Sequence, residues 1–167
     1  MTEWAAKVDP ENPLPEYPRP QLVRENWTNL NGLWDYAITE KGATKPTSFE
    51  GEILVPFCVE SALSGVKRQF TPKDQLWYSR SFQAPKRDNN ERIILNFGAV
   101  DYRSTVFING TKVGSHVGGY DAFSFDITDA LKDGENKIVV SVTDDQSGPK
   151  GKQNFAAFNN PRFIFYT

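Results

Sequence analysis

A β-hairpin signal in the middle of the chain constrains its fold more than any other feature. The β-branched and aromatic run Thr105–Ile108 is followed by Asn109-Gly110, a dipeptide that supplies the two positive-φ residues of a type I′ turn. Gly118-Gly119 then marks a bend, and apolar and small or polar residues alternate through Phe123–Ile127. This period of two is typical of a strand with one face in a core.

The same short patterns recur along most of the chain. We expect strands at Trp34–Ile38, Glu52–Val55, Trp77–Phe82, Arg92–Phe97, Thr105–Ile108, Phe123–Ile127 and Lys137–Thr143. One short helical turn is expected at Thr128–Lys132, with Thr128 or Asp129 as its cap and Gly134 as its end. Seven or eight short strands separated by turn signals predict an all-β fold, an antiparallel β-sandwich.

The first 20 residues differ from the rest in composition. Five prolines between positions 10 and 20 interrupt any helix and favour extended backbone. We therefore expect an N-terminal arm over residues 1–20 and one folded domain over residues 21–167. An ordered arm has to bury some side chains, and Trp4, Leu14 and Tyr17 are the candidates.

Composition limits the classes of function. A chain of 167 residues is too short for a sandwich followed by a catalytic barrel, which alone needs about 250 residues. A net charge of -2 indicates neither a nucleic-acid partner nor an anionic membrane surface. The single cysteine, Cys58, excludes an internal disulfide and is expected to be a buried thiol. The sequence does not encode the compartment, and a periplasmic or secreted location would require a signal peptide that had been removed.

Four segments together resemble the N-terminal sugar-binding domain of glycoside hydrolase family 2, which includes β-galactosidases, β-glucuronidases and β-mannosidases. They are Trp27–Tyr36, Val55–Phe57 with Glu60-Ser61, Leu76–Phe82, which is similar to the family's "WYRR-F" strand, and Gly98–Thr128. They occur in the family's order and cover most of residues 20–153. The resemblance implies a jelly-roll sandwich of the galactose-binding-domain type.

The resemblance also implies that the chain alone has no catalytic residues. In the family both catalytic glutamates lie on a (β/α)8 barrel that follows this domain, and no segment here reads as that barrel. We expect Glu50, Glu52 and Glu60 to be surface or turn residues. His116 is expected to satisfy backbone groups of a turn, the alternative being a polar contact to a sugar or a neighbouring domain. No cofactor and no metal site are predicted.

Two kinds of residue are candidates for sugar binding. In the family an aspartate just after the strand Lys137–Thr143 reaches the sugar, and Asp144 and Asp145 match that position. The alternative for both is a solvated acidic turn. Tyr102 and Tyr120 lie in turn-like segments and are candidate platforms for the apolar face of a sugar ring. For Trp77 and other strand aromatics, packing in a core is the commoner explanation.

Family members usually continue after a segment like Pro161–Thr167 with a strand, "SGIWQ-VWLE", that this sequence does not contain, which would leave Phe163–Tyr166 as an exposed apolar tail. We therefore expect an exposed C-terminal edge, through which a homodimer could form. The favoured function is that of a non-catalytic sugar-binding and scaffold domain of a family 2 β-glycosidase. Among the enzymes of the family, the β-galactosidase type is favoured. Its partners would be an oligosaccharide or β-glycoside and the catalytic barrel. The alternatives are an independent carbohydrate-binding module and a purely structural interaction domain.

Overall fold

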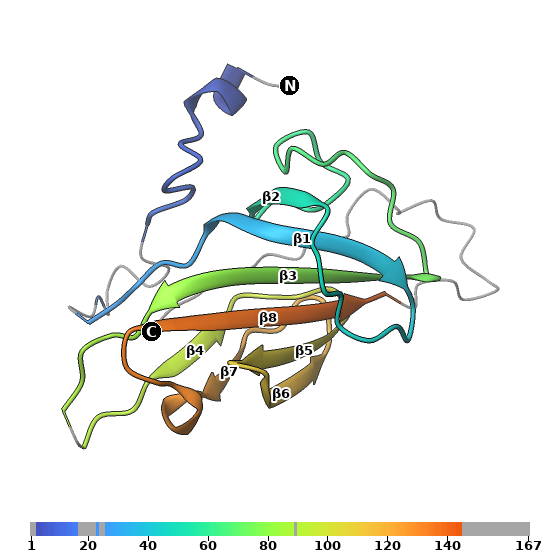
Figure 1. Cartoon of the computed structure of the whole chain (residues 1–167). Coiled ribbons are helices and arrows are strands. Elements are labelled where there is room, and N and C mark those ends of the chain that lie inside the picture. The colour runs from blue at the N-terminus through green and yellow to red at the C-terminus, as the bar shows by residue number, and fades with distance from the viewer. Residues whose placement is uncertain (1–2, 17–22, 24–25, 89, 145–167) are drawn as a thin grey trace.

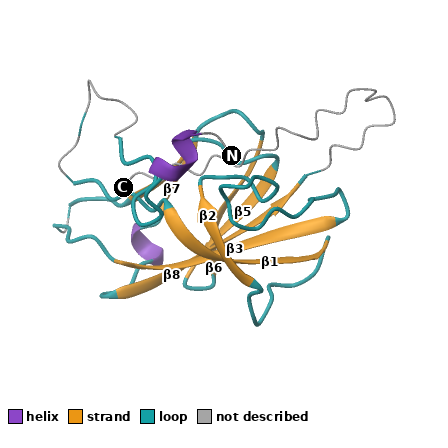
Figure 2. Cartoon of the chain, turned by 90° about the horizontal axis from the view of Figure 1, so that it is seen from above, coloured by secondary structure: helices purple, strands orange, loops and turns teal. Residues whose placement is uncertain are grey.

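The computed structural model describes residues 3–16, 23, 26–88 and 90–144, and in this part of the chain the all-β antiparallel fold is confirmed. The strands are β1 (Gly32–Glu40), β2 (Gly51–Val55), β3 (Asp74–Gln83), β4 (Ile94–Phe97), β5 (Arg103–Ile108), β6 (Thr111–Val117), β7 (Phe123–Asp126) and β8 (Glu135–Thr143). The same residues contain two short 3-10 helices, η1 (Glu3–Lys7) and η3 (Thr128–Ala130), coloured purple in Figure 2.

The described strands form two sheets. The larger has the order β2-β1-β3-β8-β5-β6, and the smaller pairs β4 with β7. Figure 1 shows β1, β3 and β8 running side by side through the larger sheet. The last strand, β8, lies between β3 and β5, so distant parts of the sequence are neighbours in the sheet, as a Greek-key or jelly-roll sandwich requires.

The main core lies between the two sheets. Trp34 of β1 and Tyr78 of β3 meet edge to face, with ring centroids 6.5 Å apart, and the Trp34 indole N–H donates to the Leu30 carbonyl at 2.8 Å. The expected alternation is confirmed in β8, where Ile138, Val140 and Val142 all face this core. It is also confirmed at residues 93, 95 and 97 on and beside β4.

The β5–β6 hairpin has the turn that the sequence predicts. Asn109 and Gly110 adopt φ values of 51° and 86°, as a type I′ turn requires. The Asn109 amide also donates to the Ala130 carbonyl at 2.9 Å and to Asn136 Oδ1 at 2.7 Å, and its oxygen accepts from the Lys137 N–H. This asparagine therefore connects the hairpin to η3 and to the start of β8.

The corner where the two sheets meet depends on one glycine. A Cβ placed on Gly114 of β6 would lie 2.1 Å from the Phe125 ring of β7, a distance that real Cβ atoms do not reach. That ring packs against Phe97 and Phe123. The absence of a side chain at position 114 is what lets β7 come close to β6.

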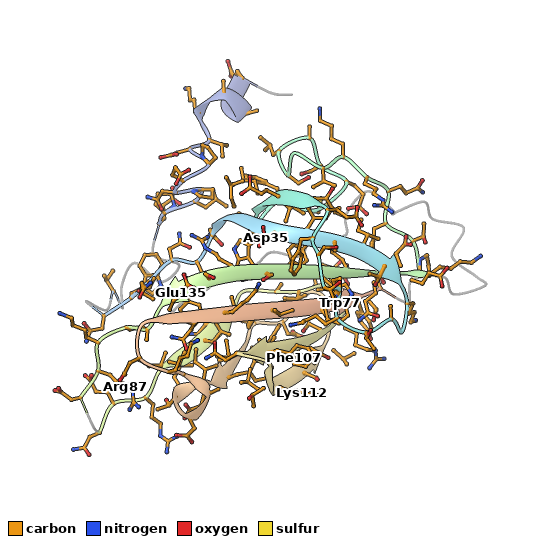
Figure 3. The ribbon with its side chains drawn as sticks, viewed as in Figure 1. Asp35, Trp77, Arg87, Phe107, Lys112 and Glu135 are labelled. Carbon is orange, nitrogen blue, oxygen red and sulfur yellow. The ribbon has the colours of Figure 1, made fainter. Side chains whose placement is uncertain are left out.

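The outer face of the larger sheet carries a second, small hydrophobic cluster. Ala37, Trp77 and Val139 are buried there, and Phe49 and Phe107 pack against them. Phe49 belongs to the connection between β1 and β2, residues 41–50, which we call the strap and which crosses in front of the sheet in Figure 1. Figure 3 labels Trp77 and Phe107, which lie on either side of β8. The expectation that Trp77 packs in a core is confirmed, although this core is the outer one.

The helical turn after β7 is shorter than expected and is capped differently. It is the 3-10 helix η3, and neither Thr128 nor Asp129 provides the cap. Instead, Asp126 Oδ1 accepts from the Thr128 N–H at 3.0 Å. Asp126 also pairs with Arg92, so one carboxylate serves both the turn and an ion pair.

The described part of the N-terminal arm is held by polar contacts. The Pro13 and Leu14 carbonyls accept from the side-chain amides of Asn31 and Asn29, at 3.3 and 3.4 Å. Pro13 is buried, but Leu14 is 52% exposed, so the expectation that Leu14 packs against the domain is wrong. The Trp4 side chain and Tyr17 lie outside what the structure describes.

Candidate functional site

One end of the sandwich brings together most of the predicted site residues. Arg103, the first residue of β5, pairs with Thr143 of β8 on one side and with Val117 of β6 on the other. The residues just before β5, just after β8 and just after β6 therefore meet at the same end. Tyr102, Asp144 and the loop with Tyr120 all belong to these segments.

Asp144 directly follows β8, as predicted, but it is buried. It continues the alternate positions 138, 140 and 142 that face the main core, and only 3% of its surface is exposed. The alternative of a solvated acidic turn is therefore wrong for Asp144. Asp145 lies outside the described residues, as do Lys150–Gln153 and Phe163–Tyr166.

Two further carboxylates gather near Asp144, and the three together form what we call the acidic end: Glu60, Asp101 and Asp144. Burial, and after it the charge of Asp144, raises the pKa of Asp101 from 3.8 to about 6. Burial also raises the pKa of Glu60, to which Asp144 adds a smaller effect while backbone hydrogen bonds act in the opposite direction. The three groups come from three separate segments, and the charge of Asp144 disfavours the charged forms of both Asp101 and Glu60.

Polar groups continue inward from the acidic end. The Tyr78 phenol is completely buried, and burial, followed by the nearby Cys58 and Glu60, holds its pKa well above the usual value. Burial likewise raises the pKa of the Cys58 thiol, and the expectation of a buried cysteine is confirmed. Glu60 lies in a turn, as expected, and is half-buried there.

The loop between β6 and β7, residues 118–122, forms the rim of this end, and we call it the rim loop. The Gly118 N–H donates to the Tyr102 carbonyl at 2.9 Å, and Gly118 has a φ of 141°. The next two residues differ sharply: Gly119 lies against Asp101, whereas the Tyr120 side chain is 90% exposed. Of the two tyrosines expected as platforms, Tyr102 is half-buried and Tyr120 is open to a ligand.

His116 is held by an aromatic contact. Its ring stacks on Phe123 with centroids 4.1 Å apart and planes 10° from parallel. Its Nδ1 is buried and has no hydrogen-bond partner among the described residues, so the expectation that its nitrogens satisfy the turn backbone is wrong for this atom. A packing role for His116 explains its position better than a contact with the backbone.

Sequence reasoning missed Glu60 and Asp101 as members of this end. Neither stands in a pattern that marks a buried carboxylate, because each precedes or follows ordinary turn residues. The one available signal was the position of Asp101 two residues before β5, a strand that pairs with β8. Within residues 3–16, 23, 26–88 and 90–144, no cluster of three or more His, Cys, Asp or Glu side chains is arranged to hold a metal ion. The same residues contain no helix long and apolar enough to cross a membrane.

Comparison with known proteins identifies the family. Residues 56–159 match the model described as the glycosyl hydrolase 2 galactose-binding domain-like family. A "putative beta-glucuronidase" of Formosa agariphila is 38% identical over 85 residues, which are 49% of this chain and 10% of the relative. A "beta-galactosidase" of Thermoanaerobacter pseudethanolicus is 40% identical over 68 residues, which are 40% of this chain and 9% of the relative.

Solved structures show the same likeness. The structure of a Lactobacillus rhamnosus "beta-glucuronidase" covers 74% of this chain with a TM-score of 0.62 and 30% identity, and the match spans 22% of that protein. The chain thus spans about a tenth to a fifth of the proteins that it matches. The antiparallel sandwich and the family match over most of its strands show that the chain belongs to the glycosyl hydrolase 2 galactose-binding domain-like family.

Proposed function

We propose that this domain contributes part of a sugar-binding site to a family 2 β-glycosidase whose catalytic residues lie outside this sequence. The observation that carries the proposal is the acidic end, where Asp101 and Glu60 are half-buried beside Asp144 and the exposed Tyr120 stands on the adjoining rim loop. Carboxylates accept hydrogen bonds from sugar hydroxyls, and a tyrosine ring stacks on the apolar face of a sugar.

Within this arrangement the residues have different roles. Tyr120 is the outermost group and serves as the platform. Glu60 is close enough to the surface to face hydroxyl groups, while Asp144, at 3% exposure, forms the base of the site. Asp101 lies against Gly119 of the rim loop. The adjoining surface is expected to come from the catalytic barrel, since relatives named as glycosidases are five to ten times longer than the matched segment.

We further propose a neutral sugar, as in the β-galactosidase type, in preference to a uronic acid. Three carboxylates at one end repel an anionic ligand, and the raised pKa values of Asp101 and Glu60 indicate how unfavourable further negative charge would be there. The relatives include both β-glucuronidases and β-galactosidases, so the charge of the sugar is the question that an experiment has to decide.

The experiment is a ¹⁵N NMR titration of the 167-residue chain with methyl β-D-galactopyranoside and, separately, methyl β-D-glucuronide. We expect the galactoside to shift amides at 101–102 and 118–121 with a Kd above about 1 mM, as suits half of a site. Stronger binding of the glucuronide at these amides would contradict the neutral-sugar proposal. If neither sugar shifts these amides, the proposed contribution to a sugar site is wrong.

A self-contained carbohydrate-binding module is the second candidate, and the 90% exposed Tyr120 beside carboxylates favours it. The same titration separates the two. A Kd well below 1 mM for the isolated chain would indicate a complete site and favour the module.

A further inference from the structure

Asp101 has a geometric relation to the rim loop that a role in binding hydroxyls does not require. The three atoms nearest to a Cβ built on Gly119 all belong to Asp101: Oδ1 at 2.5 Å, Cγ at 2.7 Å and Cβ at 3.2 Å. The Asp101 side chain therefore lies along its whole length against Gly119. No other residue at position 119 fits without moving this side chain or the loop.

The neighbouring residue holds the same loop. The Tyr102 carbonyl accepts from the Gly118 N–H at 2.9 Å, so two consecutive residues of one segment contact two consecutive residues of the other. Asp121 turns back over Gly118, with its Oδ2 3.2 Å and the His116 ring 3.2 Å from a Cβ built there. Tyr120 is the residue between these contacts, and its side chain projects away from them.

Asp101 also lies near Asp144. The charge of Asp144 acts on Asp101, and the register of β5 against β8 places the two residues at the same sheet end. Asp101 thus stands between the buried base of the site and the loop that carries its platform. A ring held in one place before binding loses less conformational freedom when a ligand stacks on it.

We propose that Asp101 is a positioning residue, which fixes Tyr120 relative to Asp144 by packing against Gly119. The inference that this serves sugar binding rests on the proposed function. The packing role itself does not, because it concerns the order of the rim loop in the free protein.

The first test measures loop order without any ligand. In the wild-type chain we expect ¹⁵N order parameters near about 0.85 for residues 118–121, as in rigid backbone, and below about 0.6 in Asp101→Ala and in Gly119→Ala. Asp101→Asn keeps the shape of the side chain, so the order parameters of this variant should equal those of the wild type. Matched controls are Asp35→Ala, at an exposed carboxylate of β1, and Gly51→Ala, where a Cβ meets only Tyr36 at 3.5 Å. Unchanged β3 and β8 amide shifts will show that each variant is folded.

The second test asks whether Asp101 acts through Tyr120. With methyl β-D-galactopyranoside as the probe, we expect Asp101→Ala to weaken binding about fivefold in the wild-type background, equivalent to about 1 kcal/mol. In the Tyr120→Ala background it should have no further effect, because the group that it positions is gone. Asp101→Asn should stay within about twofold of wild type.

The outcomes are distinct. A rim loop that is disordered in the wild type, or equally ordered in Asp101→Ala, overturns the positioning role. Equal losses from Asp101→Ala in both backgrounds would mean that Asp101 contacts the sugar directly, which also overturns it. If the wild-type chain binds no sugar, the proposed function fails, and the order parameters alone decide the positioning role.

Discussion

The two ends of the larger sheet treat buried charge in opposite ways. At one end Arg80 of β3 faces inward, and its Nη1 donates to the Leu30 and Asn31 carbonyls, each at 2.7 Å. Burial lowers the pKa of Arg80, and Glu11 of the arm partly offsets that effect. At the other end Asp144, Asp101 and Glu60 gather, and the charge of Asp144 raises the pKa of both neighbours.

The comparison shows that buried charge stabilises the fold at one end of this sandwich and destabilises it at the other. At the arginine end the domain supplies acceptors from its own backbone, and the result is a clamp on the entry to β1. At the acidic end the charges oppose one another, which costs stability and is typical of a site prepared for a ligand. Substitutions at the arginine end should therefore destabilise the fold, whereas a neutral substitution of Asp101 at the acidic end should stabilise it.

The largest expected effect tests the arginine end. Arg80→Ala removes the donor for two carbonyls of buried residues, and we expect a loss of about 2–3 kcal/mol in the free energy of unfolding, measured by urea denaturation. Arg87→Ala is the matched control, because Arg87 is exposed and its hydrogen bond to the Glu91 carbonyl is 3.4 Å long. Equal stability of the two variants would remove the contrast between the ends.

An apolar substitution between the two ends provides a reference loss of unfolding free energy against which the charged substitutions can be compared. Gly114→Ala forces a Cβ into the Phe125 ring, and overpacking of this kind costs about 1–3 kcal/mol. We expect about 2 kcal/mol by urea denaturation, while Gly51→Ala stays close to wild type. A neutral Gly114→Ala would mean that the β6–β7 corner is loosely packed.

The opposite sign is expected at the acidic end. The folded-state pKa of Asp101, about 6, lies above its unfolded value near 3.8, so ionisation of this group reduces stability as pH rises from about 4 to 6. Asp101→Asn removes this cost and should stabilise the protein at pH 7 by about 1 kcal/mol, after allowance for screening at a half-buried site.

The pH dependence provides the control for that prediction. Below about pH 3, where Asp101 is mostly protonated in both states, the wild type and Asp101→Asn should be equally stable. Asp144→Asn should also lower the pKa of Asp101, measured from its side-chain carbon shift. A destabilised Asp101→Asn at pH 7 would mean that the Asp101 charge is satisfied in the fold.

The smallest expected effect comes from Asp126, a carboxylate that has hydrogen-bond partners and therefore contrasts with Asp101. Hydrogen bonds from Thr128 and Arg92 lower the pKa of Asp126 from 3.8 to about 2. Asp126 therefore contributes stability above about pH 4 that is lost as pH falls through 2. Asp126→Asn should be slightly less stable than wild type at pH 7, and thermal unfolding at both pH values should show this difference disappearing near pH 2. A pH slope like that of Asp101 would contradict this assignment.

Strands β4, β7 and β8 could be predicted because their apolar residues follow a period of two, and the β5–β6 turn because Asn109-Gly110 is typical of a type I′ turn. Strand β6 was not among the expected strands, because its residues do not alternate between apolar and polar. The outer cluster could not be predicted in this way, since the burial of Trp77 and Ala37 depends on Phe49 of the strap and Phe107 of β5, which pack against them. The position of Asp144 followed from the family pattern. Its burial, and the approach of Glu60 and Asp101, depend on long-range contacts that no local pattern encodes.

The strap has a practical consequence. Trp77 lies under Phe49 with 4% of its surface exposed, and its indole N–H donates to Thr39 Oγ1 at 3.0 Å. Trp34 lies on the other side of the same sheet, in the main core. The two indoles are therefore natural fluorescence probes of two different events: red-shifted emission from Trp77 would report detachment of the strap, and that from Trp34 would report separation of the sheets.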